Sequence, residues 1–381
     1  MQTAIVHYWL VGMRGGEKVV ESLCRLYPDA DLFVHVYRPE AVSPLIRARQ
    51  ITQTFIGRLP FAAKLYKNYL PLMPMALEQL DLRKYDLIIS SESGPAKGIV
   101  PPPGSVHICY CHSPMRYVWN MFHEYRRTSG RLKRLLMLPA AHYIRSWDAL
   151  SAQRVDHFVA NSHTVAERIT RYYRRDSQVI PPPVAVEDFY IDPEAGKDGT
   201  WLMAGELVPY KRPDLAVRAF NRMGRRLIVV GGGEMLDELR RLAGPTVTVL
   251  GPQPFATLRQ LYAESFALVF PGEEDFGIVP VESMASGRPV LAFGRGGATE
   301  TVVEGVTGLF FHTQSVEAII DGVERMQTLK VNPQAIRIHA ERFATAVFER
   351  RMRNFIDSVT SRAGTVPVPH QNLVLVKPER A

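Results

Sequence analysis

The chain has 381 residues, 46% hydrophobic and 22% charged, which is typical of a soluble globular protein and long enough for two domains. It has no run of 18 apolar residues and only three cysteines, so we expect no membrane-spanning helix and a reducing compartment. The net charge of +8 is uneven, because residues 1–180 hold 24 Lys+Arg and 14 Asp+Glu whereas residues 181–381 hold 22 and 24. The basic half is expected to face an anionic partner, a phosphorylated substrate or a membrane surface, and the absence of zinc-finger and RNP-like motifs argues against nucleic acid.

Short apolar runs in both halves predict strands that are buried on both faces, as in parallel sheets. They are TAIVHYWL, YDLIIS, VHICYCH and HFVANS in the first half, and TWLMAGE, RLIVVGGG, TVTVLG, ALVFPG and RPVLAFG in the second. Helical patterns such as RPDLAVRAFNRM lie between them, so we predict two doubly wound, Rossmann-like α/β domains. The first run lacks a basic region and a cleavage site, and is interpreted as a strand and not as a signal peptide.

Three prolines in VIPPPVAVEDFY mark the domain boundary. The last helical pattern has Phe348, Met352, Phe355 and Ile356 on one face, and we expect this helix to cross back and cover the first domain. The predicted divisions are a first domain over 1–180, a second over 181–344, the crossing helix over 345–362 and a loose tail over 363–381.

Two glycines, Gly15 and Gly16, lie in the loop VGMRGGEKVVE between the first strand and the first helix. The loop lacks the full G-x-G-x-x-G spacing of dinucleotide sites, so it fits either a tight turn or a close approach to a ligand. The sequence DAD at 29–31 is interpreted as a turn that enters a strand. Cys109 and Cys111 are interpreted as buried strand thiols, because two close ligands alone do not make a metal site.

His112 ends the apolar run VHICYCH, and the carboxyl end of a parallel strand faces the cleft where such sheets bind ligands. A histidine at that place can donate to a hydroxyl or exchange a proton near neutral pH. Arg116 and Trp119 follow it and fit either an acceptor site or simple packing. The loop SSESGPAKG at 90–98 ends another strand and is expected to border the same cleft.

Lys211 lies in ELVPYKRPDL, between a strand and a helix that begins near Pro213. A lysine there can neutralise a diphosphate leaving group as a point charge, although a solvated charge at a helix entrance has the same pattern.

The stretch GEEDFGIVPVE at 272–282 joins a strand to a helix whose first turn accommodates Pro280. The free amides at such a helix N-terminus favour an anion such as a diphosphate. The residues placed at this turn are Phe276, Gly277, Ile278 and Val279. Glu274 before the turn and Glu282 inside the helix can then bracket a ligand, unless they are ordinary surface acids.

The same stretch resembles the E-x7-E motif of retaining glycosyltransferases of family 4, which have the GT-B fold. The segments GELVPYKRPDLAVRAF, LIVVGGGEMLDELRRL and SGRPVLAFGRGGATETV agree with it. The first half is similar to mannosyltransferases of bacterial polysaccharide assembly at GGEKVVE and YCHSPMRYVW. The resemblance covers about residues 1–360.

The resemblance implies a role for each of these residues. Glu282 holds the ribose of the nucleotide, Glu274 contacts the hexose, and His112 lies beside that sugar. The turn amides contact sugar and phosphate, and the Gly15–Gly16 loop lies near the donor phosphates and the acceptor. The family has an arginine five residues before the lysine, where this chain has Glu206. Either Arg212 supplies the second charge, or donor binding is weak, or transfer is impaired.

The resemblance also implies a retaining transfer of a hexose, with GDP-mannose as the expected donor and no required metal. The expected acceptor is a polyprenyl-diphosphate-linked saccharide, as in exopolysaccharide or O-antigen assembly. Segments 54–80 and 126–145 mix basic with apolar side chains, which suits an anionic membrane surface or an ordinary solvated helix face. We therefore expect a cytoplasmic protein, peripherally bound to the inner face of the cell membrane.

Two other functions stay open from the sequence. One is a hydrolase similar to nucleotide-sugar 2-epimerases, which share the fold. The other is a nucleotide-sugar-binding protein with impaired transfer, which Glu206 keeps under consideration.

Overall fold

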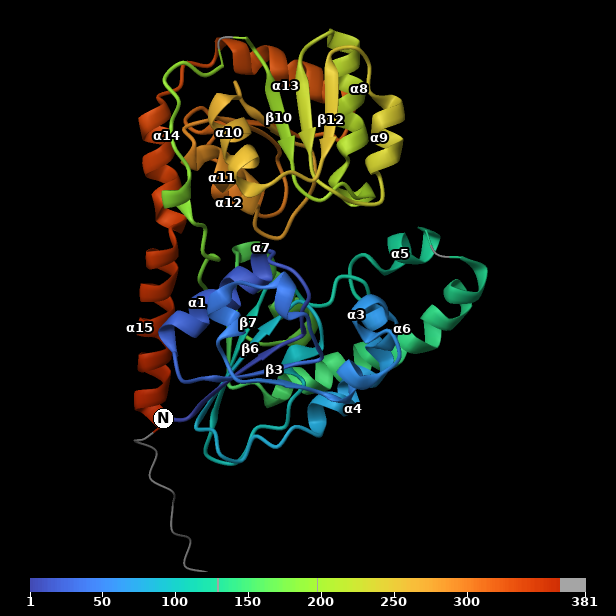
Figure 1. Cartoon of the computed structure of the whole chain (residues 1–381), viewed down its shortest axis with the longest axis vertical. Helices are drawn as coiled ribbons and strands as arrows, with labels where there is room; N and C mark the ends of the chain where they lie inside the picture. The colour runs from blue at the N-terminus through green and yellow to red at the C-terminus, as the bar shows by residue number, and fades with distance from the viewer. Residues whose placement is uncertain (129, 197, 364–381) are drawn as a thin grey trace, which may run out of the picture.

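A computed structural model describes residues 1–128, 130–196 and 198–363. It has two α/β domains, one above the other, with the last helix running along the side of the lower one (Figure 1). The expected pair of doubly wound domains is confirmed. The loose tail predicted over 363–381 lies outside the described residues except for its first one, which ends the last helix.

The first domain contains a parallel sheet of seven strands in the order β5-β3-β1-β6-β7-β8-β9. Its strands are β1 (Thr3–His7), β3 (Asp31–Val34), β5 (Ile51–Gln53), β6 (Leu87–Glu92), β7 (Val106–Cys111), β8 (His157–Ala160) and β9 (Ser177–Val179). The run TAIVHYWL divides after His7, since β2 (Trp9–Leu10) pairs with β4 (Val36–Tyr37) in a separate small sheet.

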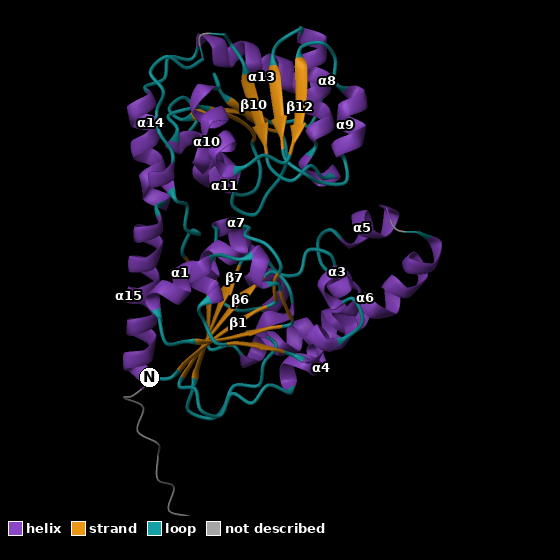
Figure 2. Ribbon diagram, viewed as in Figure 1, coloured by secondary structure: helices purple, strands orange, loops and turns teal. Residues whose placement is uncertain are grey.

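The second domain contains a parallel sheet of six strands in the order β12-β11-β10-β13-β14-β15. The strands are β10 (Trp201–Ala204), β11 (Leu227–Val230), β12 (Val247–Gly251), β13 (Leu268–Phe270), β14 (Val290–Phe293) and β15 (Gly308–Phe311). Helices cover the faces of both sheets (Figure 2), so the inner strands are buried on both faces and their sequences do not alternate, whereas the edge strands β5, β9 and β12 are partly exposed.

The helices of the first domain are α1 (Gly15–Leu26), α2 (Pro44–Arg47), α3 (Ala62–Leu65), α4 (Met73–Glu78), α5 (Phe122–Thr128), α6 (Arg131–Ser151) and α7 (His163–Tyr173). Those of the second domain are α8 (Pro213–Met223), α9 (Leu236–Leu242), α10 (Phe255–Glu264), α11 (Ile278–Ala285), α12 (Ala298–Thr301), α13 (Val316–Thr328) and α14 (Pro333–Ala340), and α15 (Thr345–Ala363) follows. Short 3-10 turns include η2 (Phe55–Arg58), η3 (Tyr66–Leu72) and η7 (Pro209–Lys211).

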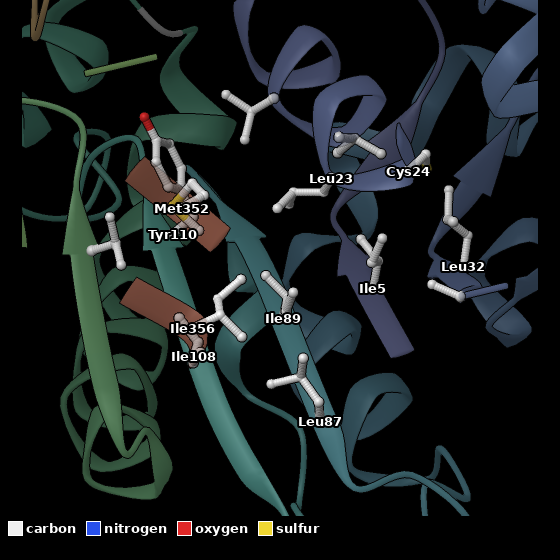
Figure 3. Packing of buried hydrophobic residues seen from close by; sticks show 14 of the residues in the cluster. Ile5, Leu23, Cys24, Leu32, Leu87, Ile89, Ile108, Tyr110, Met352 and Ile356 are labelled. Atoms are coloured by element: carbon white, nitrogen blue, oxygen red, sulfur yellow. The ribbon is translucent and has the colours of Figure 1, made fainter. Parts of the chain in front are cut away.

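The last helix packs on the first domain, although its sequence follows the second. Phe348, Met352 and Ile356 of α15 belong to the core cluster that also contains Ile5 and Tyr110 (Figure 3). The Phe348 and Tyr110 rings lie 5.6 Å apart. The described part of the chain, residues 1–363, therefore begins and ends on the first domain.

Two segments connect the domains, and they are bonded to each other. The amide of Val184 donates to the carbonyl of Phe343 at 3.0 Å, and the amide of Thr345 donates to the carbonyl of Val184 at 3.1 Å. Val184 and Ala344 form a parallel bridge. The outgoing and returning chains thus cross side by side.

Two further expectations can be compared with the structure. Cys24, Cys109 and Cys111 are all buried free thiols. No helix among the described residues is long and apolar enough to cross a membrane.

Candidate active site

The entrance of α11 forms the centre of the candidate site in the second domain. Gly277 precedes the helix with φ of 96°, a left-handed conformation that glycine adopts without strain. The loop before it is anchored because the amide of Gly297 donates to the carbonyl of Glu274 at 2.8 Å. The first amides of the helix have no carbonyl one turn earlier to bind, so this turn presents free donors to an anion.

Lys211 and Glu274 meet beside this turn. Lys211 ends η7, which follows β10, whereas Glu274 lies in the loop after β13, the strand that neighbours β10 in the sheet. The Nζ atom of Lys211 lies 2.7 Å from Oε1 of Glu274, and the side chains are 15% and 20% exposed. Parallel strands that end at the same edge of a sheet bring these distant residues together.

Glu282 lies inside the first turns of α11 and has one strong partner. The hydroxyl of Tyr262 on α10 donates to Oε2 of Glu282 at 2.8 Å. Burial raises the pKa of Glu282 to about 7, with the Tyr262 hydrogen bond opposing this shift and nearby Glu274 adding to it. A carboxyl group with such a pKa changes charge near neutral pH and is a strong acceptor above it.

Arg212, the candidate for a second cation beside Lys211, is already paired with an acidic residue. The guanidinium of Arg212 donates to both carboxylate oxygens of Asp214, at 3.1 and 3.2 Å. Glu206, at the position where the resemblance implied an arginine, lies 3.6 Å from Nη1 of Arg14 in the first domain. This distance is measured to Oε1 of Glu206. The ion pair links the loop after β10 to the residue that precedes α1.

His112 follows β7 at the opposite side of the cleft and is held by β6. Its Nε2 lies 2.9 Å from the hydroxyl of Ser91, and its amide donates to the carbonyl of Glu92 at 2.7 Å. Burial lowers the pKa of His112 to about 4, although Asp275 opposes the shift. The ring is therefore neutral at pH 7, so hydrogen bonding is its available role and proton exchange near neutral pH is not.

A second histidine, which we did not predict, lies next to it. His7 ends β1, and its Nδ1 lies 3.0 Å from the carbonyl of Ser91. The side chain is fully buried, and its Nε2 has no hydrogen-bond partner among the described residues. Burial, with His112 nearby, lowers the pKa of His7 to about 3. The signal in the sequence was a histidine at the end of the first strand.

Gly15 and Gly16 were predicted in the loop before the first helix, but they form the first turn of α1, and this start of the helix touches the turn of the second domain. A Cβ atom on Gly15 would lie 2.6 Å from Cδ1 of Ile278, the first residue of α11. A Cβ atom on Gly16 would lie 2.6 Å from the Tyr8 hydroxyl and 3.7 Å from Nε2 of His112. Both glycines therefore allow close approach, and the loop brings the anion-binding turn and His112 to one place.

Two arginines of the first domain bind one carboxylate of the second. Nη1 of Arg116 lies 3.5 Å from Oδ1 of Asp275, and Arg168 forms a closer ion pair with the same oxygen. Arg116 also stacks on Tyr210, with its guanidinium carbon 5.0 Å from the ring centre. Arg116 thus lies at the contact between the two domains, and its role beside an acceptor stays a prediction. Neither Asp275 nor Arg168 was predicted, because their partners lie in the other domain.

Trp119 has internal partners. Its indole N–H donates to Oδ2 of Asp148 at 2.7 Å, and its ring stacks on Tyr172 at 4.6 Å. Asp148 also binds the buried Lys97, which in turn binds Glu92 at 2.8 Å. The structure shows the packing role of Trp119, and its role beside an acceptor stays a prediction. The loop at 90–98 contributes to this buried network through Glu92 and Lys97.

A further carboxylate of the second domain caps a helix of the first. Glu300, on α12, accepts from the amides of His163 and Thr164 at 2.7 and 2.9 Å, and from the Thr164 hydroxyl at 3.1 Å. These amides form the N-terminus of α7, where a negative charge is favoured. Asp275, Glu206 and Glu300 thus each form a polar contact between the second domain and the first.

The described side chains do not form a metal-binding cluster. Within residues 1–128, 130–196 and 198–363, no group of three or more His, Cys, Asp or Glu side chains could hold a metal ion. The turn DAD leads into β3, which begins at Asp31, as expected.

Two family models match the chain. The model described as "Glycosyltransferase Family 4" matches residues 13–188, and the model described as "Glycosyl transferases group 1" matches residues 187–343. The two matches meet in the segment where the structure changes from the first domain to the second.

Among curated proteins, the chain is 35% identical over 158 residues to a D-inositol 3-phosphate glycosyltransferase of Mycobacterium leprae, which is 37% of each protein. It is 32% identical over 177 residues to a GDP-mannose-dependent alpha-(1-6)-phosphatidylinositol monomannoside mannosyltransferase of Mycobacterium tuberculosis, covering 39% of this chain and 46% of that protein. The chain thus spans less than half the length of these curated relatives that it matches.

Solved structures share the fold over nearly the whole chain. The Anabaena HepE protein in complex with UDP-glucose is 16% identical, with a TM-score of 0.68 over 94% of this chain and 100% of that one. A sucrose-phosphate synthase from Thermosynechococcus elongatus is 18% identical, with a TM-score of 0.69 over 95% and 100%. At these identities, the likeness concerns the arrangement of the two domains.

Proposed function

The chain belongs to glycosyltransferase family 4 with the GT-B fold, and from that premise we propose that it moves a hexose from a nucleotide sugar on the second domain to an acceptor on the first. The contact between Gly15 and Ile278 carries the proposal. It brings the anion-binding turn of α11 against the loop that also approaches His112. A sugar diphosphate on the turn would then place its hexose between the two domains.

Each residue of the site has a role in the proposed transfer. Glu282 accepts from the ribose hydroxyls, while the amides at Gly277 and Ile278 bind phosphate. Glu274 and His112 contact the hexose. Lys211 stabilises the charge that develops on the leaving diphosphate, which is worth more in a site that excludes water. We propose that no resident metal is needed, because positively charged side chains of the chain, together with the helix amides, supply the compensating charge.

Retention is proposed through displacement on one face of the sugar. Glu274 is already bound to Lys211 and serves to bind the sugar, so it is not assigned as a nucleophile. The acceptor hydroxyl attacks as the bond to the diphosphate breaks, and the leaving diphosphate takes the hydroxyl proton. The activation barrier is lowered by interactions that stabilise the negative charge of the transition state more than that of the bound substrate.

The donor that we propose is GDP-mannose. The sequence relative from M. tuberculosis is named for that donor, and its match includes 39% of this chain. HepE, whose sequence is much less similar, was solved with UDP-glucose. The comparison of GDP and UDP is therefore part of the experiment below.

The acceptor that we propose is a lipid-linked saccharide at an anionic membrane, on the cytoplasmic side, in polysaccharide assembly. Large apolar side chains are exposed on the first domain at or next to α3, in α4 and in the first part of α6, helices that lie to one side of that domain (Figure 1). They include Phe61, Leu65, Met75, Leu135 and Leu136. Lys64 and Lys67 lie among them, as a headgroup layer requires.

Incubation of the purified protein with donor, with and without acceptor, tests the proposed function. A transferase consumes GDP-mannose and makes a new glycoside only when a polyprenyl-diphosphate saccharide is present. A 2-epimerase-like hydrolase changes the donor alone, and a binding protein does neither, so either outcome would overturn the proposal. A thermal shift with GDP, UDP and ADP identifies the base, because a ligand that binds only the native state raises its stability.

A further inference from the structure

The second domain offers little uncompensated positive charge to a diphosphate. Lys211 is paired with Glu274 at 2.7 Å, and Arg212 is held by both oxygens of Asp214. Glu206, in the same loop as Lys211, adds a negative charge at the same edge of the sheet. A donor that carries several negative charges therefore needs another cation, since the free amides of one helix turn contribute only partial charges.

Arg14 is a cation of the first domain that contacts the loop of Glu206 and Lys211 directly. Its Nη1 is 3.6 Å from Oε1 of Glu206, and the two side chains are 70% and 45% exposed. A pair with this distance and exposure is weak and easily exchanged. Arg14 can therefore leave Glu206 for a stronger anion, whereas Arg212 would have to break a two-point contact.

The backbone of Arg14 is fixed next to the turn. Its amide donates to the carboxylate of Glu17 at 3.0 Å, as the cap of α1. The next residue, Gly15, lies against Ile278 at the entrance of α11. A fixed backbone with an extended, exposed side chain is suited to reaching a ligand on that turn.

We propose that Arg14 is the second cation of the diphosphate site, supplied across the cleft, and that Glu206 holds its guanidinium near the site until the donor binds. This inference rests on the proposed function. Donor binding exchanges the Arg14–Glu206 pair for a contact between Arg14 and phosphate, so the same event binds the diphosphate and fastens the glycine loop of the first domain to the second. Arg14 is a binding and positioning residue.

Calorimetry with GDP and guanosine separates a phosphate contact from a change in fold. Arg14→Ala is expected to weaken GDP binding about tenfold, as for loss of a charge-assisted hydrogen bond, and to leave guanosine binding unchanged. Arg14→Lys should keep part of the GDP affinity. The matched control is Arg83→Ala, which removes an exposed arginine paired with Asp81, before β6 and away from the cleft edge of the sheet.

The exchanged pair provides the second test. In the double variant Arg14→Glu/Glu206→Arg, the second domain supplies the cation, so GDP affinity should return toward that of the wild type. The single variant Arg14→Glu should have the lowest GDP affinity of these proteins. GDP affinity of Arg14→Ala within twofold of the wild type would overturn the inference, as would an equal loss for guanosine. If the wild type binds no nucleotide, both the proposed function and this inference fail. If the wild type binds GDP and transfers sugar but Arg14→Ala keeps its GDP affinity, only the role of Arg14 fails.

Discussion

Arg168 of the first domain and Asp275 of the second form an ion pair across the cleft, with side chains only 12% and 17% exposed. The same guanidinium lies 3.3 Å from the hydroxyl of Ser113. Ser113 follows His112 and Asp275 follows Glu274, so one side chain connects the neighbours of two residues that we propose to contact the hexose.

We predict that Arg168→Ala lowers transfer by about 10- to 100-fold while GDP affinity changes little, because the partly buried Asp275 loses one of its two guanidinium partners, at a cost of about 1–3 kcal/mol. The matched control is Arg171→Ala, an exposed arginine on the same helix. Arg168→Ala, Asp275→Ala and the double variant form a cycle in kcat/KM. Strictly additive losses would mean that the pair does not couple the two sides.

Glu282→Ala should weaken binding of the nucleoside diphosphate by about 1–3 kcal/mol, because the ribose hydroxyls and Tyr262 lose a buried acceptor. Titration calorimetry measures this directly. Glu264→Ala, which removes an exposed glutamate at the end of α10, is the control. Unchanged affinity of Glu282→Ala would remove Glu282 from the ribose site.

The raised pKa of Glu282 adds a pH dependence to that binding. With a pKa of about 7, its carboxyl group is mostly protonated at pH 6 and mostly ionised at pH 8. If the carboxylate is the form that accepts from ribose, guanosine affinity rises between these pH values in the wild type and stays flat in Glu282→Gln. Guanosine is used because its phosphate-free form excludes titration of the ligand's phosphates. Parallel pH curves for both proteins would contradict the assignment.

Glu274→Ala and His112→Ala should each lower turnover on the order of 100-fold while GDP still binds, because both are assigned to the hexose and not to the nucleotide. Steady-state rates combined with GDP calorimetry separate the two effects. Near-normal transfer by either variant would exclude that residue from the sugar site. No kinetic pKa near 6.5 should belong to His112, since burial lowers its pKa to about 4.

Stability should fall as the pH is lowered from about 6.5 toward 4. Burial lowers the pKa of five described histidines, to about 3 for His7 and His35, to about 4 for His107 and His112, and in the same direction for His339. The unfolded chain binds these protons below pH 6.5 and the folded chain does not, which removes about 1.4 kcal/mol per pH unit for each histidine.

The raised pKa values of Glu92 and Glu282, with burial the main cause of each, act in the opposite direction, because these groups stabilise the folded state below about pH 4.5 and lose that effect as pH rises toward 7. Glu17, whose pKa burial also raises, acts in the same direction, but the five histidines outnumber these three carboxyls, so the net trend on acidification is a loss. Urea unfolding at pH 7.5, 6 and 5 measures it. Stability that is constant or rises toward pH 5 would contradict the buried neutral histidines.

Cosedimentation with vesicles tests the proposed membrane surface. Binding should be stronger to anionic than to neutral lipid and weaker at high salt, because each basic side chain near the surface contributes about 1 kcal/mol. Lys64→Glu/Lys67→Glu and, separately, Leu135→Ser/Leu136→Ser should reduce it. The control is Arg240→Glu/Arg241→Glu on α9 of the second domain. Binding that ignores both lipid charge and salt would leave an ordinary solvated surface and a soluble acceptor.

The local parts of the site could be read from the sequence. Glu274, the turn at Gly277 and Glu282 are within one strand–turn–helix unit, and strand ends in a parallel sheet place Lys211 beside them. His7 was missed because a buried histidine in a strand has no local pattern that separates a packing role from a site. What distinguishes His7 is its position beside Ser91 and His112, and that position depends on the order of the strands in the sheet.

Contacts between the domains could not be predicted, because no local period encodes how two separate domains face each other. The uneven charge illustrates this. We interpreted the basic first half as the face for an external anion, yet Arg14, Arg116 and Arg168 bind acids of the second domain. Part of the asymmetry is thus complementarity within the chain. The remaining basic side chains stay candidates for a membrane.

The segment 54–80 was also harder to predict than the sheets. It forms short 3-10 and α turns instead of one amphipathic helix, since Pro60, Pro71 and Pro74 interrupt it and Phe61 takes a left-handed conformation. Its exposed apolar side chains therefore lie on an irregular surface that sequence periodicity cannot describe.

The paired connections between the domains limit how this molecule can move. A single flexible linker would let the second domain swivel and slide, but here an outgoing and a returning segment are hydrogen bonded at Val184, Phe343 and Thr345, next to a run of prolines. Sliding or twisting would break those bonds, whereas bending both segments together preserves them. We therefore expect one dominant opening motion, a rotation about this double crossing, so that every substrate that enters and every product that leaves passes through the side of the cleft opposite α15.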